Sequence, residues 1–433
     1  MVSVTVSAIA YVVLYLLSVD VLSTRDVVCM KDSVLIVWWA LPLVLVYDGF
    51  VCFVGLFVFV YLLAVSCTLH TASVVSMELS TTSITIACAS TTILLVDDVI
   101  VFYTLFEVLL IAMYWYLVRH IQHARGMYAV LLLVIYTVIG STLLLLGMVT
   151  QYIMIGSTSS IACTELTGCS SKEYVYTVLL HIAFSTKIPC YPVHAWLVDA
   201  HVESTTEASI LLAGIYLKIG ICGWWRYLLS TSTTAVRILL PYTICMLVLA
   251  TLSVSVHSIS TADIKRFAAC SSILHMQCSV TCMMLSKDAI LLHAAMIMIA
   301  MHTLIASYLF YVCGTMYVSH GIRVASQIGV YGTASWVLLY LMLSNASYPC
   351  TASYYAEVYM IGTAILYAPL VSMCVLVSGG VLAVVGVVLW STCSMGRVQY
   401  LGCHSSSTIL VHVPLLIYSI LCSDAKQCVY LLV

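Results

Sequence analysis

Long apolar runs, interrupted by short charged or turn-rich gaps, fill most of the chain. A helix needs roughly 20 mostly apolar residues to cross a hydrocarbon core of about 30 Å, and most runs have that length. Cutting the sequence at its gaps predicts about fourteen spanning helices, the twelfth continuing past a proline. The expected ranges are 2–19, 34–47, 49–66, 82–96, 99–118, 127–150, 174–198, 206–229, 238–257, 268–286, 288–313, 328–364, 366–390 and 408–422. The pattern therefore predicts an all-α fold, a polytopic membrane helix bundle.

Two of the expected helices contain prolines at membrane depth. The seventh has Pro189 and Pro192, and the twelfth has Pro349. A proline removes a backbone hydrogen bond that lipid cannot replace, so the freed groups must face protein or a wet cavity. Broken helices five spans apart, each with an ionisable side chain nearby, are what two inverted repeats of five helices would produce. We therefore expect discontinuous helices and an ion path at the breaks.

The expected organisation has four parts. They are N-terminal helices over 1–81, a first repeat over 82–229, a second repeat over 230–390 and a C-terminal helix over 391–433. The first run, 2–19, has no basic segment before it and no small-residue cleavage site after it. We therefore expect it to be a retained helix rather than a signal peptide.

Composition supports this class and excludes others. Hydrophobic residues make up 63% of the 433 positions and charged residues 7%, which no ordinary soluble domain shows. The net charge of -2 offers no basic face for nucleic acid. The 19 cysteines fall in apolar runs without a C-x-x-C pair, so we expect neither a metal nor an iron–sulfur site. No Walker loop or G-x-G-x-x-G unit is present, so no nucleotide site is expected either.

Four ionisable side chains fall inside apolar runs instead of gaps, namely Glu107, Lys187, Lys218 and Glu357. A charge at mid-helix costs about 2.5–3.5 kcal/mol on insertion scales, so these groups should face one another or water inside the bundle. Burial disfavours a charged form and an opposite charge restores it, so each group can be switched by its neighbour. Withdrawal of Glu107 would push Lys187 to release a proton, which Lys218 and then Glu357 would receive. The alternative is a static ion pair that holds helices in register.

Histidines supply intermediate steps for such a relay, because imidazole accepts a proton on one nitrogen and donates from the other. His194 and His201 follow Lys187 at intervals of seven, which places them on one face if the helix resumes after the break. His275 and His302 lie in later helices. For each histidine, a hydrogen-bonded core residue is the competing interpretation.

The segment 183–226, AFSTKIPCYPVHAWLVDAHVESTTEASILLAGIYLKIGICGWWR, resembles the signature of the antiporter-like subunits of respiratory complex I. In that family a lysine, a proline-broken turn, His-x-Trp-Leu and Ala-His-x-Glu precede a second lysine one helix later. FYTLFEVLL resembles the family's glutamate motif, and TADIKRFAACSSILHM and MIMIAMHTLIASYLF resemble its later histidine segments. The resemblance covers roughly residues 95–365.

Within the family, LSNASYPCTASYYAEVYM resembles the subunit 4 branch, which carries a glutamate where subunits 2 and 5 carry a lysine. The resemblance therefore implies a multi-pass protein of the mitochondrial inner membrane. It implies no cofactor in this chain, with NADH, FMN, iron–sulfur clusters and ubiquinone in other subunits of the complex. The implied partners are the lipid bilayer and other membrane-arm subunits, especially the antiporter-like subunits 2 and 5.

The implied activity is proton translocation coupled to electron transfer from NADH to ubiquinone, as one subunit of an H⁺-translocating NADH:ubiquinone reductase. The implied relay has Glu107 and Lys187 as the coupling pair, Lys218 as its centre and Glu357 as the terminal carrier. The implied connecting residues are His194, His201, His275 and His302.

The chain departs from the family pattern beside the first break. Val198 stands where proline is usual, and Ser204 and Thr205 stand where Ala-Pro is usual, which puts the geometry of the 199–207 loop in question. Arg266 replaces an uncharged residue and Cys270 replaces a tyrosine.

Two other functions compete with the relay in a redox enzyme. The related subunit of a multisubunit sodium/proton antiporter shares the lysines and the glutamate but is not attached to a redox enzyme. A structural scaffold, in which buried charges only fix helix register, predicts that neutralising Lys218 harms assembly but leaves pumping per electron unchanged.

Overall fold

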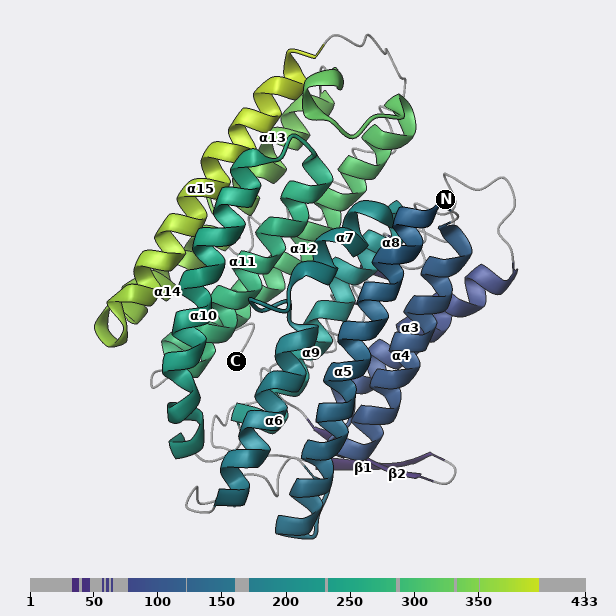
Figure 1. The fold of residues 1–433 in the computed structure, drawn as a ribbon, viewed down its shortest axis with the longest axis vertical. Coiled ribbons are helices and arrows are strands. Elements are labelled where there is room, and N and C mark those ends of the chain that lie inside the picture. The colour runs from purple at the N-terminus through teal and green to yellow at the C-terminus, as the bar shows by residue number, and fades with distance from the viewer. Residues whose placement is uncertain are drawn as a thin grey trace.

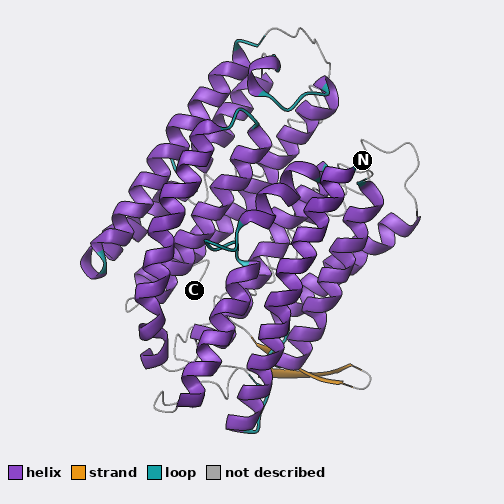
Figure 2. Cartoon of the chain, in the orientation of Figure 1, coloured by secondary structure: helices purple, strands orange, loops and turns teal. Residues whose placement is uncertain are grey.

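A computed structural model shows helices running side by side through a tilted bundle (Figure 1; Figure 2). It describes residues 33–38, 41–46, 57, 60, 61, 64, 77–121, 123–159, 171–229, 233–285, 289–330, 333–349 and 351–396. The expected helices 2–19 and 408–422 lie outside these residues, as does most of 49–66.

From α3 onward, the first half of the described chain forms five helical units. They are α3 (Met77–Leu95), α4 (Val99–His120), α5 (Ala124–Ile155), the pair α6 (Ser171–Lys187) and α7 (Ala195–Glu203), and the continuous run of α8 (Thr206–Leu211), η2 (Leu212–Tyr216), α9 (Leu217–Gly223) and η3 (Trp224–Leu229). The fourth unit is broken around the prolines, as the sequence predicts.

The second half repeats this order. Its units are α10 (Thr233–Ser260), α11 (Ile264–Leu285), α12 (Ala289–His320), the pair α13 (Thr333–Asn345) and α14 (Ala352–Tyr367), and α15 (Pro369–Ser394), with a short turn η4 (Ala325–Gln327) between α12 and α13. Again the fourth unit is the broken one. The discontinuous helices are confirmed, and the boundaries of the two repeats, which the order supports, stay a prediction.

Seven helical segments in the described ranges are long and apolar enough to cross a membrane. They are Val99–His120, Ala124–Ile155, Thr206–Leu229, Val236–Ser260, Ile264–Leu285, Ile290–Val318 and Pro369–Ser394. The predicted class, a polytopic membrane helix bundle, is confirmed.

One expected helix is wrong. The described residues of the range 34–47 belong to two antiparallel strands, β1 (Ser33–Trp38) and β2 (Leu41–Val46), drawn in orange in Figure 2, and Ser33 pairs with Val46. The run is rich in valine, isoleucine and leucine, and an apolar run of this length fits a strand as well as a buried helix. Cross-strand pairing satisfies the same backbone groups that a helix would satisfy within itself.

The interior of the bundle is centred on α11, which lies between α12 and α10 (Figure 1). Every α11 residue from Phe267 to Leu285 is buried, including its serines, threonines and histidine. By contrast, α5, α10 and α15 expose large apolar side chains such as Ile153, Val256 and Val384. An apolar outer face and a polar centre suit a protein surrounded by lipid.

Candidate functional site

The first helix break places Lys187 in the last turn of α6. Pro189 has no N–H and ends the helix, and the freed carbonyl of Thr186 accepts a hydrogen bond from Nε1 of Trp196 at 3.0 Å. The C-terminal end of a helix carries partial negative charge, which favours a cation there. The break therefore prepares a position for a buried lysine.

Lys187 is 1% exposed, and its ammonium group lies among aromatic rings. Its Nζ donates to Oη of Tyr216 at 3.1 Å and sits 4.0 Å from the ring centroid of Phe106, a cation–π contact. Glu107, the next residue of α4, is near enough for its charge to act on Lys187. Oε1 of Glu107 is buried without a hydrogen-bond partner among the described residues. The predicted pair is brought together, with the rings of Phe106 and Tyr216 supplying the direct contacts to the lysine.

Lys218 lies just after a π-helical turn. The widened turn η2 leaves the carbonyl of Ala213 available, and Nζ of Lys218 donates to it. Nζ also lies 2.9 Å from Nδ1 of His302 on α12. The lysine side chain is fully buried. Tyr216, which binds Lys187, stands two residues before Lys218 on the same segment, so one short stretch of chain carries both contacts.

Two histidines extend this cluster toward the second break. The ring centroids of His302 and His275 are 5.6 Å apart, and the rings are tilted by 55°. Nε2 of His275 lies 2.8 Å from the carbonyl oxygen of Asn345, the last residue of α13. A buried series of polar side chains therefore runs from Lys218 through His302 to His275 and the second break.

His201 is the other predicted connecting residue that joins the cluster. Its ring stacks on Phe310 with centroids 4.4 Å apart and planes 9° apart. Both ring nitrogens are buried without a hydrogen-bond partner in the described part of the chain. The charges of Lys265 and Lys218 both act on it.

Glu357 lies beyond the second break. It is on α14, 9% exposed, and its Oε2 has no hydrogen-bond partner within the described ranges. Its carboxyl group lies near Ser347 and near Cys278 of α11. Gly379 of α15 makes room for it, because a Cβ at position 379 would meet Oε1 of Glu357. The carboxylate therefore lies against α11, α15 and Ser347.

The structure does not bring His194 to the others. α6 ends at Lys187 and α7 begins at Ala195, so the interval of seven residues is not two turns of one helix. His194 instead stacks on Tyr191, with ring centroids 5.4 Å apart, and lies near His257 of α10. Its role as a connecting residue stays a prediction.

Sequence reasoning missed three residues of this region: Tyr216, Lys265 and Asn345. Lys265 was assigned to a gap, but Asp263 accepts from the backbone N–H of Lys265 at 2.9 Å and α11 begins at Ile264. Asn345 had a signal in the sequence, because the carbonyl four residues before Pro349 loses its helical partner. Tyr216 had none beyond its position two residues before Lys218.

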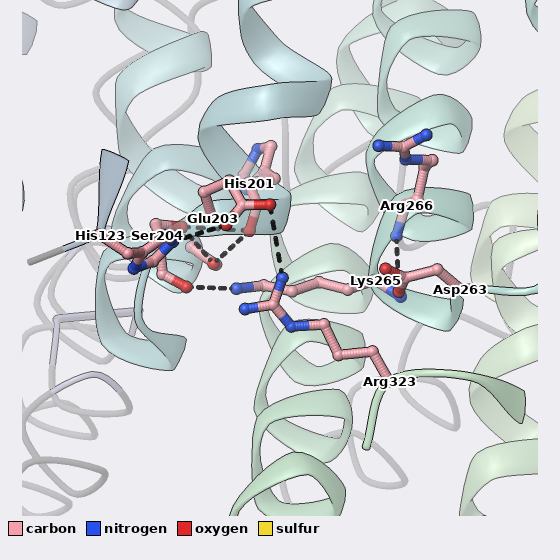
Figure 3. A network of polar contacts seen from close by, with 9 residues as sticks. His123, His201, Glu203, Ser204, Asp263, Lys265, Arg266 and Arg323 are labelled. Atoms are coloured by element: carbon pink, nitrogen blue, oxygen red, sulfur yellow. Dashed lines mark hydrogen bonds and ion pairs between the residues drawn. The ribbon is translucent and has the colours of Figure 1, made fainter. Parts of the chain in front are cut away.

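A polar network links side chains of α7 and α11 with residues next to α5 and α12 (Figure 3). Glu203, the last residue of α7, accepts from Nε2 of His123 at 2.7 Å and forms an ion pair with Arg323 at 3.7 Å. Lys265 reaches across to donate to the carbonyl of Ser204. A cavity of about 260 Å³ lies beside this network, lined by Lys265 and Arg323 among others.

The 199–207 loop, whose sequence departs from the family pattern, is short and well capped. α7 ends at Glu203 and α8 begins at Thr206, so only two residues join them. The side chain of Thr205 accepts from the N–H of Ala208 and caps α8, and the hydroxyl groups of Ser204 and Ser209 are 2.8 Å apart. These hydroxyls end one helix and start the next without the usual prolines.

In the described ranges, no three His, Cys, Asp or Glu side chains gather as metal ligands would.

The geometry defines the class, a multi-pass membrane helix bundle with ionisable side chains connected through its interior. The family model for NADH:quinone oxidoreductase/Mrp antiporter, TM, matches residues 96–383. The chain belongs to this family.

Curated relatives agree with the family. NADH-ubiquinone oxidoreductase chain 4 of Marchantia polymorpha is 30% identical over 264 residues, which cover 60% of this chain and 53% of the relative. NADH-quinone oxidoreductase subunit M of Rickettsia prowazekii (strain Madrid E) is 33% identical over 267 residues, which cover 60% and 54%. The matches thus span about half the length of these relatives.

The fold agrees over a longer range. A chain of respiratory complex I from Thermus thermophilus with bound NADH superimposes with a TM-score of 0.81, covering 98% of this chain and 92% of that chain. The sequences are 16% identical, so this likeness concerns the fold alone.

Proposed function

We propose that the chain is a proton-translocating subunit of the membrane arm of an NADH:ubiquinone oxidoreductase. The observation that carries the proposal is the buried contact between Lys218 and His302, at 2.9 Å between Nζ and Nδ1. The family and the names of the relatives support the redox assembly. The redox cofactors then belong to other subunits, and this chain supplies the proton path.

The location and partners follow from the same proposal. A subunit 4 chain belongs in the mitochondrial inner membrane, beside other membrane-arm subunits and especially the antiporter-like subunits 2 and 5. The relatives named chain 4 support this location over a bacterial membrane, although a bacterial subunit M matches comparably well. The exposed apolar faces of α5 and α15 suit lipid or neighbouring subunits.

The relay begins at the first break. A positive charge on Lys187 is held by Tyr216, by the face of Phe106 and by the charge of Glu107. When Glu107 withdraws or gains a proton, this stabilisation falls and Lys187 loses its proton more readily. Oε1 of Glu107 can accept such a proton, because it makes no hydrogen bond to the described residues. The proton that Lys187 then releases passes toward Lys218.

The second half of the relay runs from Lys218. The ammonium group gives a proton to Nδ1 of His302 across 2.9 Å, which leaves a neutral amine still bonded to the carbonyl of Ala213. His302 passes charge toward His275, whose ring centroid is 5.6 Å away. Glu357, in the other half of the break, receives the proton last. Each buried site then holds one charge at a time, which limits the cost of burying ions.

The first experiment is to purify the native membrane assembly that contains this chain and reconstitute it in liposomes. NADH oxidation with quinone as acceptor, accompanied by a proton gradient, is the expected result. A protonophore should collapse the gradient and accelerate oxidation, because a gradient built by a coupled pump opposes its turnover.

The same preparation separates the alternatives. Sodium/proton exchange without NADH oxidation contradicts the proposal and supports a subunit of a multisubunit antiporter. The family includes Mrp antiporter subunits, so the exchange assay is run in parallel with imposed sodium and proton gradients.

A further inference from the structure

The carbonyl of Asn345 loses its helical partner because of Pro349. α13 ends at Asn345, and in a continuous helix this carbonyl would accept from the N–H of residue 349. Proline has no N–H. His275 of α11 forms a hydrogen bond to this carbonyl, with Nε2 2.8 Å from the oxygen. Because a backbone carbonyl can only accept, Nε2 carries a hydrogen in this contact.

The neighbouring carbonyls of α13 are satisfied within the break itself. The carbonyl of Leu343 accepts from the N–H of Tyr348 at 3.0 Å, and that of Ser344 accepts from the N–H of Ser347 at 3.2 Å. Asn345 is instead held from α11, whose Ser271 also donates to its side-chain Oδ1 at 3.3 Å. The last residue of α13 is therefore fixed to α11 through both its backbone and its side chain.

The contact determines what His275 does with a proton. The ionisable groups that face it are His302 of α12 and Lys218 of α9. A proton that comes from His302 must add at Nδ1, because Nε2 already carries one. The resulting imidazolium directs its Nε2 proton at an amide carbonyl, which does not take up a proton. The transfer stops there while the bond to Asn345 stands.

Glu357 lies close to the far side of this bond. Ser347 and Cys278 both lie near its carboxyl group. Ser347 is two residues from Asn345 in the break, and Cys278 is about one helical turn from His275 on α11. Both partners of the bond, Asn345 and His275, thus have a near neighbour in the chain that lies beside the carboxylate, which makes Glu357 the acceptor for a proton from a released Nε2.

We propose that the Asn345 carbonyl, freed by Pro349, gates proton transfer at His275. In the closed form, His275 accepts a proton at Nδ1 and returns it from the same nitrogen. When the α13–α14 break releases the bond, Nε2 gives up its proton toward Glu357 and the ring keeps the proton on Nδ1. Water that enters the open break then takes the proton from Nδ1 and supplies one to Nε2, which restores the resting tautomer without net gain or loss of a proton, and the gate closes. The proposal rests on the proposed relay and assigns the point at which it is interrupted.

The test is a proline substitution that returns the missing N–H. In Pro349→Ala the amide of residue 349 competes for the Asn345 carbonyl and releases His275. The passive proton conductance of liposomes that contain the whole native assembly is measured without NADH. It is expected to rise about fivefold, since a hydrogen bond of ordinary net strength biases an equilibrium by about that factor. An unchanged conductance overturns the proposal.

Two further variants test whether the added proton conductance of Pro349→Ala, called the leak below, passes through His275. Pro369→Ala removes a proline from the first turn of α15, where the N–H has no acceptor within the helix, and should leave the conductance unchanged. In Pro349→Ala/His275→Gln the leak should disappear, because a glutamine amide can donate to the carbonyl but cannot relay a proton. A leak that persists in the double variant comes from a disturbed bundle and contradicts the gate.

A spectroscopic readout decides the question even if Pro349→Ala does not assemble. In the resting assembly labelled with ¹⁵N-histidine, the NMR signals absent from His275→Gln should show a hydrogen on Nε2 and none on Nδ1. Signals of a ring protonated on Nδ1 at rest overturn the proposal. Neither readout requires NADH oxidation. If both readouts support the gate but the assembly does not oxidise NADH, the proposed redox function is refuted and the proposed gate is not.

Discussion

Replacing Lys218 with methionine separates a proton relay from a structural scaffold. Methionine keeps the length and the apolar stem of the side chain but loses the donor that contacts Ala213 and His302. The relay predicts that pumping is lost in complexes that still assemble. The scaffold predicts the reverse, with poor assembly and normal pumping in whatever forms.

The structure indicates how much stability changes. Two buried acceptors, the carbonyl of Ala213 and Nδ1 of His302, lose their donor at a cost of about 1–3 kcal/mol each. Removing an ammonium from the interior of the bundle regains about 2.5–3.5 kcal/mol on insertion scales. The two effects cancel to within a few kcal/mol. Assembly of Lys218→Met should therefore be close to that of the unmodified protein.

The assay measures NADH oxidation and proton translocation per assembled complex in liposomes. A positioned acid–base group contributes about 10²–10⁴-fold to proton transfer, so transfer through this chain should fall at least 100-fold. If NADH oxidation and proton translocation are tightly coupled, turnover itself falls. If they are loosely coupled, the number of protons translocated per electron falls. Lys172→Met is the matched control, because Lys172 is an exposed lysine in the first turn of α6. Unchanged translocation per electron at unchanged turnover in Lys218→Met would refute the relay.

Two other substitutions test the breaks. In Gly379→Ala, the new Cβ meets Oε1 of Glu357 and displaces the carboxylate, so proton translocation should fall while Gly380→Ala, with open space at its Cβ, stays normal. Equal translocation in the two alanine variants would contradict the role of Glu357. In Trp196→Phe, the buried carbonyl of Thr186 loses its donor, and thermal denaturation of the assembly should show a loss of about 1–3 kcal/mol. An unchanged denaturation temperature would mean that another donor replaces the indole.

The hydrophobic pattern predicts the bundle because lipid leaves few alternatives to a helix. The ranges expected for α4, α5, α10 and α15 agree with the structure to within several residues. The pattern fails at 34–47, where length and apolarity do not separate a hairpin from a helix. It also places the start of α11 too late, because hydropathy does not register the capping carboxylate of Asp263.

The site is less predictable than the fold. Burial of a charge in an apolar run is visible in the sequence, and it identified Lys187 and Lys218. The partners of those charges come from other helices and depend on packing. Tyr216, which binds Lys187 where a carboxylate contact was expected, could not be distinguished from the other 28 tyrosines. The position of His194 depended on where the helix resumed after two prolines, which periodicity cannot give.

The two breaks share a support that neither sequence motif reveals. The backbone N–H of Tyr191, in the first break, donates to Oε1 of Gln277 at 3.0 Å, and the carbonyl of Asn345, in the second, receives His275. Both supporting side chains lie on α11, two residues apart and therefore on nearly opposite faces of the helix. A rotation of α11 about its axis would change both bonds together, whereas a bend in any outer helix would not. Burying the polar side chains of α11 costs free energy in a membrane protein, and the contacts of this helix to both interrupted helices give a physical reason for that cost.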